Sequence, residues 1–143
     1  MTLRENKKKL KIAVQMDSLD KINKDTDSTL SIIKEAYKRK YEVFIYNVDD
    51  LTLEKNNPTA KVKKLVNINF NKKKFLSLGR NIDKKLKSFD VILIRQDPPF
   101  NMKYITSTYI LEKVSSSCLI LNNPQSIRER NEKLFVMDFP HLM

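Results

Sequence analysis

The pattern of apolar and polar positions in the first third of the chain predicts a strand, a helix and a second strand. Apolar residues alternate with other residues over 10–16, and β-branched and aromatic residues fill 41–48, as is typical of strands. Between them, apolar residues at helical spacing predict a helix from 27 to about 39, capped by Thr26 or Asp27. Its predicted buried stripe consists of Leu30, Ile33, Ala36 and Tyr37. This order predicts a βαβ unit with parallel strands.

The middle of the chain has a different pattern, with short apolar runs separated by Asn, Pro and Lys. We expect a small antiparallel excursion around residues 51–79, with a turn at Asn56-Asn57-Pro58. Residues 90–95 then include four consecutive large apolar side chains, which indicate a strand covered on both faces of a sheet.

The last third predicts a helix, a strand and a mixed helical region. The helix is expected from 104 to about 114, the buried strand over 118–121, and helical structure over 126–137. The helix face is expected to contain Ile105, Tyr109 and Ile110. Ser126 and Glu129 have the spacing of a capping box. Together the elements predict an α/β fold of three layers with a mainly parallel sheet, interrupted by the antiparallel excursion.

Polar residues follow several of the predicted strands and form the strongest functional signal of the pattern. Ligands of such sheets bind beyond the carboxyl ends of the strands, where we expect Asp17, residues 95–100 and residues 122–126 to meet. The guanidinium of Arg95 is suited to a carboxylate, and the prolines after it make a rigid loop. The alternative is a purely structural loop in which Arg95 pairs with Asp97. The pattern alone does not decide between the two.

Composition excludes several classes of function. A single glycine, Gly79, excludes a Walker loop, a dinucleotide fingerprint and a Gly-rich lid. One cysteine (Cys118) and one histidine (His141) exclude a structural zinc site and a disulfide framework, and Cys118 is interpreted as a core residue. No apolar run is long enough to span a membrane, and we expect a cytoplasmic protein.

The net charge of +11 allows a second class of function, a basic nucleic-acid-binding module. Lysine rather than arginine carries most of this charge, however, and the lysines fall in short clusters at expected loops, strand ends and solvated faces. Nucleic-acid modules tend to use arginine with aromatic residues among the basic ones. A solvated, lysine-rich surface is therefore the favoured interpretation, and nucleic acid is an unlikely partner.

A series of motifs in a fixed order gives a more specific indication. They are Val14-Gln15-Met16-Asp17, Ile22-Asn23, Asp27-Ser28, the run from Val91 to Phe100 with Arg95-Gln96-Asp97-Pro98-Pro99-Phe100, Thr108 to Glu112, Asn123 to Arg128, and Asn131 to Phe135. In these motifs the chain resembles the amino-terminal part of the prokaryotic glutathione synthetases, which are ATP-grasp ligases. The resemblance covers residues 10 to 139, nearly the whole chain.

The resemblance implies a fold, a reaction and a set of site residues. It implies a Rossmann-like, pre-ATP-grasp domain that forms one wall of the peptide site. The family joins γ-glutamylcysteine to glycine through an acyl phosphate, using ATP and Mg²⁺. By the matching motifs, Arg95, Asp17, Asp27 and Ser28 are expected to bind the peptide substrate, and Lys133 is expected to approach ATP. No catalytic or metal-binding residue is expected in this chain.

The chain also departs from the family pattern. Ser18 stands where the family usually has proline, and Lys40 stands where a glycine normally closes the first helix. The expected organisation is a basic tail over 1–9, a substrate-binding domain over 10–128, and the start of a missing ATP-grasp domain over 129–143. That missing domain would come from the same chain or from a separate polypeptide, and a homo-oligomer is possible. The 143-residue chain alone is expected to hold no cofactor and to be inactive, and a degenerate remnant is a further alternative.

Overall fold

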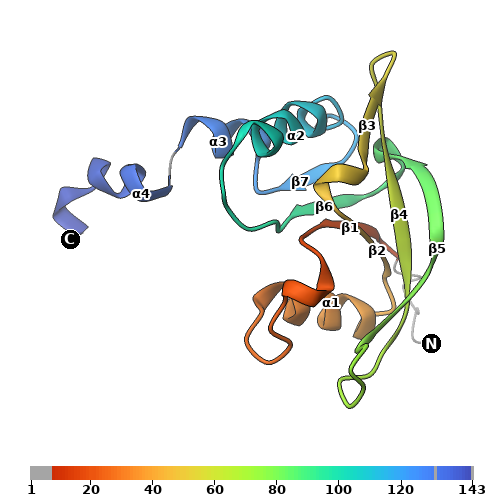
Figure 1. The fold of residues 1–143 in the computed structure, drawn as a ribbon. Coiled ribbons are helices and arrows are strands. Elements are labelled where there is room, and N and C mark those ends of the chain that lie inside the picture. Colours follow the sequence, from red (N-terminus) through yellow and green to blue (C-terminus); the bar gives the residue numbers. More distant parts are fainter. Residues whose placement is uncertain (1–7, 131, 143) are drawn as a thin grey trace, which may run out of the picture.

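A mixed β-sheet forms the centre of the molecule (Figure 1). The computed structural model describes residues 8–130 and 132–142, without the side chains of Glu132 and Lys133. Within that part of the chain the strands are β1 (Lys11–Gln15), β2 (Glu42–Tyr46), β3 (Leu51–Glu54), β4 (Asn57–Ile68), β5 (Leu76–Lys85), β6 (Val91–Ile94) and β7 (Leu119–Leu121). Their order is β3-β4-β2-β1-β6-β7, and β5 also pairs with β4. Strands β2, β1, β6 and β7 are parallel, whereas β3, β4 and β5 pair antiparallel.

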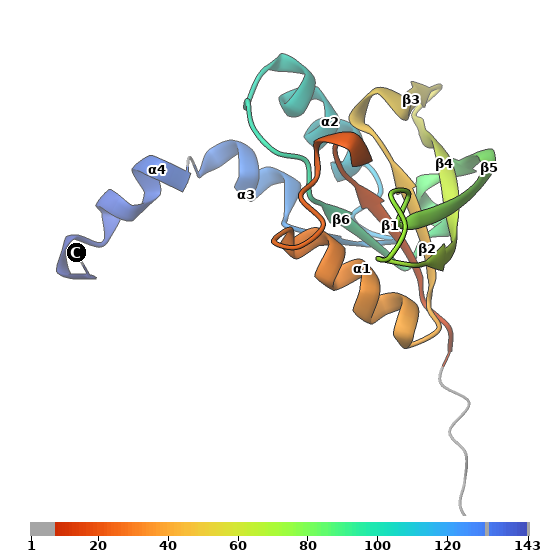
Figure 2. The same ribbon diagram turned by 60° about the horizontal axis from the view of Figure 1, so that its bottom comes forward.

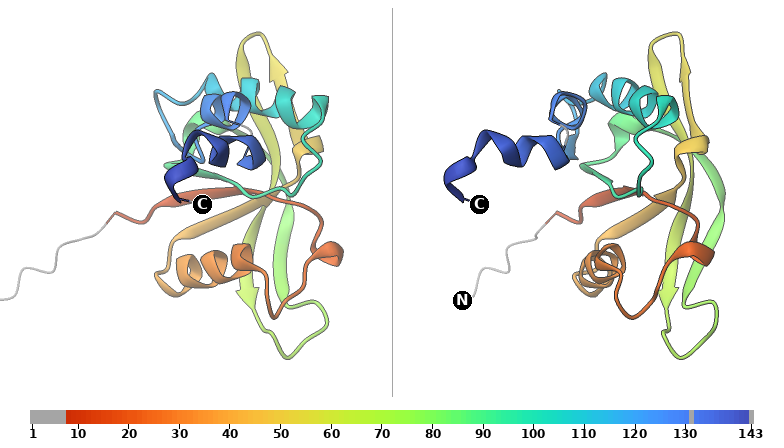
Figure 3. Two further views of the ribbon diagram at one scale, coloured as in Figure 1. Left: turned by 90° about the vertical axis from the view of Figure 1, so that its left-hand side faces the viewer. Right: turned by 60° about the vertical axis from the view of Figure 1, so that its left-hand side comes forward.

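Helices cover both faces of the sheet and give the three layers that the sequence predicts. Helix α1 (Ser28–Lys38) lies on one face, and helices α2 (Met102–Glu112) and α3 (Pro124–Glu129) lie on the other (Figures 2 and 3). Helix α4 (Glu132–Phe135) extends away from the sheet (Figure 1). Across residues 8–130 and 132–142, no helix is both long and apolar enough to cross a membrane.

Strand β1 separates two hydrophobic cores because its side chains alternate between the two faces. On the α1 side, Ile12, Val14 and Met16 pack in one cluster with Leu30, Ile33 and Ala36. On the α2 side, the cluster includes Ala13, Phe44, Tyr46, Ile92, Ile94 and Leu111. The parallel pairs β1–β2 and β1–β6 confirm the predicted βαβ unit and the buried strand at 90–95.

Helix α1 begins where the sequence predicts, with Asp27 as its cap. The Asp27 Oδ1 atom accepts a hydrogen bond from the backbone N–H of Leu30 at 3.0 Å. Tyr37, however, is exposed rather than part of the buried stripe. The stripe prediction was wrong for Tyr37 because its hydroxyl reaches sideways to the β4–β5 hairpin, where it donates to the carbonyl oxygen of Val66 at 3.4 Å.

The antiparallel excursion is present, but it is longer than predicted. Strand β5 continues to Lys85, beyond the expected end at residue 79. Residues 80–85 carry mostly polar side chains, and their backbone is held by pairing with β4 rather than by an apolar face, so they lack a strand pattern. The turn also lies one residue earlier than expected, because Lys55 and Asn56 have φ values of 45° and 63°, and Pro58 is already within β4.

Helix α2 buries a different face from the one predicted. Its buried side chains are Ser107, Thr108 and Leu111, whereas Tyr109 is exposed. The prediction was wrong because it considered apolar residues only. The two buried hydroxyls are satisfied within the helix. Ser107 donates to the Tyr104 carbonyl at 2.7 Å, and Thr108 donates to the carbonyl three residues before it. The helix also starts at Met102 rather than at Tyr104.

Two further predictions near the C-terminal end need correction. In β7 only Ile120 is buried, because this edge strand leaves Leu119 and Leu121 exposed on one face. Helix α3 begins at Pro124 with Asn123 as its cap, so Ser126 lies inside the helix and forms no capping box. Asn123 Oδ1 instead accepts the capping hydrogen bond, which comes from the backbone N–H of Ser126 at 3.0 Å.

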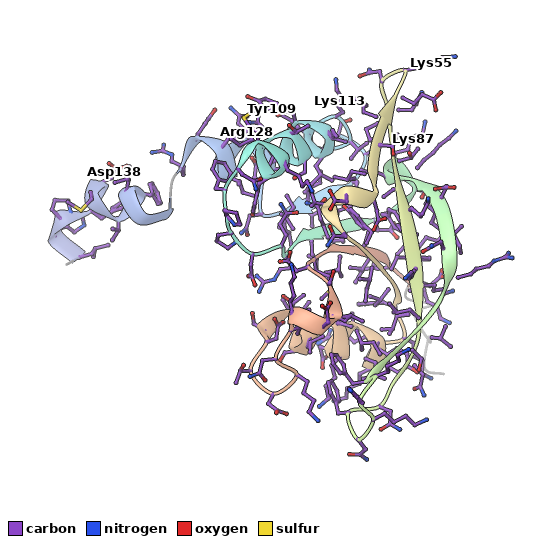
Figure 4. All side chains as sticks on the ribbon, in the orientation of Figure 1. Lys55, Lys87, Tyr109, Lys113, Arg128 and Asp138 are labelled. Atoms are coloured by element: carbon purple, nitrogen blue, oxygen red, sulfur yellow. The ribbon has the colours of Figure 1, made fainter. Side chains whose placement is uncertain are left out.

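Arg128 joins α3 to α2 and so connects the motif from Asn123 to Arg128 with the motif from Thr108 to Glu112. Its guanidinium lies 4.0 Å from the Tyr109 ring centroid, and Figure 4 shows the two side chains side by side. It also donates to the buried Thr108 hydroxyl at 3.2 Å and forms an ion pair with Glu112. These contacts fix the direction in which the chain leaves the sheet.

We expect Lys40→Gly to raise the free energy of unfolding by about 1 kcal/mol, measured by urea denaturation. Lys40 has a φ of 61° and follows α1 in a Schellman arrangement, with Tyr41 N–H bonded to the Ala36 carbonyl at 3.1 Å. Glycine adopts this conformation without strain. Lys34→Gly, at an exposed position inside α1, is the control and should lower stability by about 1 kcal/mol. Equal destabilisation by both variants would contradict the explanation.

Asp90 should make stability depend on pH. Its carboxylate accepts from Lys8 Nζ at 2.7 Å and from the Lys11 backbone N–H at 2.8 Å, and these bonds lower the pKa of Asp90. Because the folded-state pKa is below the unfolded one, the stabilisation is complete above the unfolded pKa of about 4 and is lost as pH falls through the folded pKa.

Asp90→Asn should therefore lower the free energy of unfolding by about 1 kcal/mol near neutral pH and lower it less in acid. Urea denaturation near pH 7 and near pH 3 measures both values. Asp20→Asn, at an exposed aspartate, is the control. A loss of equal size at the two pH values would argue against the charge effect.

Candidate functional site

A cleft of about 740 Å³ lies beyond the carboxyl ends of β1, β2 and β6. Its walls come from the segments that follow these strands, and they include Asp17, Lys21, Asn47, Asp49, Gln96 and Asp97. The sequence predicted that three segments meet at this edge of the sheet. Two of them, Asp17 and the loop that begins at residue 95, contribute residues to the cleft wall. The third, residues 122–126, does not line the cleft. The cleft is bordered instead by the beginning of α2, which contributes Lys103 and Tyr104.

Asp17 joins two walls of the cleft. Its Oδ2 atom accepts a hydrogen bond from the backbone N–H of Asp97 at 2.7 Å. The bond ties the end of β1 to the proline-containing loop after β6, where the two prolines fix their backbone φ angles and the Pro98–Pro99 peptide bond is cis. Opposite them, Asn47 caps a short 3-10 turn (Val48–Asp50), and Asp49 forms an ion pair with Lys103. The cleft therefore presents carboxylates and ammonium groups together.

Arg95 lies next to the cleft but is directed toward the start of α1. Its backbone N–H donates to the Gln15 carbonyl at 2.8 Å, which continues the pairing of β1 with β6. Its side chain donates from Nη2 to Ser28 Oγ at 2.7 Å and from Nε to Thr29 Oγ1 at 3.1 Å. The predicted alternative, a pair between Arg95 and Asp97, is not the arrangement found, because the guanidinium has these hydroxyl partners.

The predicted site residues thus fall into two adjacent groups. Arg95, Ser28 and Asp27 meet at the N-terminus of α1, whereas Asp17 lines the cleft. Asp27 acts there as the helix cap. The side chain of Lys133 lies outside the described residues, so its expected contact with ATP stays a prediction. The backbone of Lys133 belongs to α4.

Sequence reasoning missed a buried polar group beside the cleft. Gln15 is 0% exposed, although it lies in a strand of apolar residues. Its Nε2 atom donates to Ser107 Oγ at 3.3 Å and to Gln96 Oε1. The sequence did contain a sign of this group: Gln15 lies on the same strand face as Ala13, and a buried strand face usually has an apolar residue at such a position. Its partners come from positions 81 and 92 residues away, which no local pattern reveals.

Cys118 is a core residue, as predicted. It is buried, and burial raises the pKa of its thiol to about 11, so the thiol stays protonated and unreactive. Among the residues that the structure describes, no group of three or more His, Cys, Asp or Glu side chains is arranged to hold a metal ion.

The fold is that of an α/β domain with a cleft at the carboxyl edge of its parallel strands, which is the edge where sheets of this type commonly bind ligands. The family profile described as "Prokaryotic glutathione synthetase, N-terminal domain" matches residues 10–128. The chain belongs to the prokaryotic glutathione synthetase family, in which it corresponds to the N-terminal domain. This assignment does not favour the nucleic-acid-binding alternative.

Individual relatives agree with the family assignment. A glutathione synthetase of Rhodopseudomonas palustris is 42% identical over 134 residues, which cover 94% of this chain and 42% of that protein. Those of Bradyrhizobium diazoefficiens and of Buchnera aphidicola subsp. Schizaphis graminum are 42% and 40% identical over 94% and 93% of this chain. The chain spans about two fifths of the length of these relatives.

Asp17→Ala should loosen the loop after β6. Loss of the 2.7 Å bond removes the acceptor of the Asp97 N–H. We expect hydrogen exchange at that amide to become about tenfold faster, which corresponds to one hydrogen bond. Asp97→Ala is a matched control, since it removes a carboxylate from the same loop but keeps the N–H donor. Unchanged protection in Asp17→Ala would show that the loop is held by other contacts.

Proposed function

We propose that this domain forms the peptide-substrate side of a glutathione synthetase. In the complete enzyme, γ-glutamylcysteine and glycine would be joined through an acyl phosphate, with ATP and Mg²⁺ as cofactors. The family assignment and the cleft at the carboxyl edge of the sheet support this proposal. The observation that carries it is the position of Arg95, whose guanidinium stands at the N-terminus of α1, directly before the cleft residue Gln96.

The arrangement around Arg95 suits a carboxylate of the peptide. A guanidinium donates in parallel to both carboxylate oxygens, and a helix N-terminus adds positive potential. In this proposal Ser28 holds the guanidinium in place, and Asp27 caps the helix that carries Ser28. Asp17, in the cleft, would accept from the ammonium or amide groups of the peptide. The mixed charge of the cleft fits a zwitterionic dipeptide better than a simple anion.

The nucleotide side would lie in a second domain. We assign residues 129–143 to its beginning, residues 10–128 to the substrate-binding domain, and residues 1–9 to a basic tail. The family profile ends at residue 128, which supports this division. Lys133 would approach ATP once that domain, supplied by the same chain or a separate polypeptide, is in place. The 143-residue chain alone would bind peptide without ligating it. A cytoplasmic location and a possible homo-oligomer belong to the same proposal.

Arg95→Ala should weaken the binding of γ-glutamylcysteine to the 143-residue chain by at least about tenfold, because a charge-assisted hydrogen-bond pair is lost. Arg95→Lys should recover only part of the affinity, since an ammonium does not bind both oxygens in parallel. Titration followed by NMR measures the dissociation constants. Arg80→Ala, at an exposed arginine of β5, is the control. If Arg95→Ala and Arg80→Ala bound the dipeptide equally well, the assignment of Arg95 would be wrong.

A further inference from the structure

A chain of hydrogen bonds runs from helix α2, through the buried Gln15 side chain, to a residue that lines the cleft. Ser107 donates its hydroxyl proton to the Tyr104 carbonyl oxygen at 2.7 Å. Gln15 Nε2 donates to Ser107 Oγ at 3.3 Å, and it also donates to Gln96 Oε1. Gln96 is part of the cleft wall. A backbone carbonyl of α2 is thus connected to the cleft through three side chains.

The donors and acceptors of this chain have one consistent direction. A hydroxyl has a single proton, and Ser107 gives its proton to the Tyr104 carbonyl, so Ser107 Oγ meets Gln15 as an acceptor. The Gln15 atom facing it is therefore the donor Nε2. Because the same Nε2 meets Gln96, the Gln96 atom at that contact is the acceptor Oε1. The NH₂ group of Gln96 is then directed away from Gln15.

The reverse orientation of Gln15 would be less favourable. In the observed one, Gln15 Oε1 is buried without a hydrogen-bond partner. Reversal would put an NH₂ group with two donors in that position, and buried donors without partners are rarer than unpaired carbonyl oxygens. Tyr46 occupies the paired position of β2, and its buried hydroxyl also has no partner. Because neither atom has a partner, the Tyr46 hydroxyl makes no hydrogen bond with Gln15 Oε1, and the preferred orientation rests on the cost of burying unpaired donors.

We propose that Gln15 is a positioning residue that holds the Gln96 carboxamide with its NH₂ group toward the cleft. There Gln96 donates to an oxygen of the ligand, a carboxylate or an amide carbonyl. The inference rests on the proposed function for the identity of the ligand, and it adds a specificity-determining residue to the same site. A carboxamide left free to rotate would present its oxygen as readily as its NH₂ group. The neighbouring carboxylates of Asp17 and Asp97 have no hydrogen-bond donor to offer an oxygen of the ligand.

The test compares Gln15→Leu in two backgrounds. In the chain with Gln96, Gln15→Leu should weaken γ-glutamylcysteine binding by about tenfold, because the carboxamide loses its orientation. In the Q96K background the same substitution should change binding by less than about twofold, because an ammonium has donors only and needs no orientation. NMR titration of the 143-residue chain gives all four dissociation constants. Ser107→Ala, which removes the acceptor that orients Gln15, replaces Gln15→Leu in both backgrounds if that variant does not fold.

The four dissociation constants show whether Gln15 orients the Gln96 carboxamide. A loss confined to the background with Gln96 supports the proposal. An equal loss in both backgrounds would mean that Gln15 supports the fold only, and no loss in either would remove its role; both results overturn the proposal.

Failure of the proposed function has a different signature, which is the absence of dipeptide binding by the unsubstituted chain. In that case the side-chain amide signals decide the inference. Slow hydrogen exchange of the Gln15 NH₂ group and fast exchange of the Gln96 NH₂ group support the orientation. The opposite order overturns it.

Discussion

The central position of β1 is the constraint on which the rest of this domain depends. The strand pairs in parallel with β2 on one side and with β6 on the other, and its side chains supply both hydrophobic cores. Because the three strands run in the same direction, the segments after them emerge at one edge of the sheet. The cleft, the proline-containing loop and the Arg95 side chain all lie there as a consequence.

Two kinds of polar contact make this edge rigid. Asp17 and Asp97 join the segments after β1 and β6 through a bond to the backbone, and the Arg95 side chain ties the segment after β6 to the start of α1. In addition, Gln15 carries a polar contact from α2 through the sheet face to the cleft wall. The two hydrogen bonds of Gln15 Nε2 fit only one assignment of donors and acceptors, so they favour one arrangement of the Ser107 and Gln96 side chains.

The elements that the sequence predicted correctly are those with a strong local signal. The βαβ unit, the strand at 90–95 and the cap at Asp27 follow from apolar spacing and from a residue suited to capping. The errors occurred where something other than apolar spacing decides which residues pair or become buried. Strand β5 extends past residue 79 because β4 pairs with it, and α2 buries Ser107 and Thr108 because their hydroxyls are satisfied inside the helix. Neither the pairing of β5 with β4 nor the hydrogen bonds inside α2 can be recognised from the spacing of apolar residues.

By itself the sequence determined the fold class, the family motifs and the edge of the sheet at which polar residues gather, because short-range periodicity and residue type are sufficient for these. Only the tertiary structure decided how the candidate residues are grouped. It separates Arg95, Ser28 and Asp27 at the start of α1 from Asp17 in the cleft. It also reveals Gln15 as a buried polar residue. The physical reason is that hydrogen-bond partners more than 60 residues apart meet only after the sheet has formed.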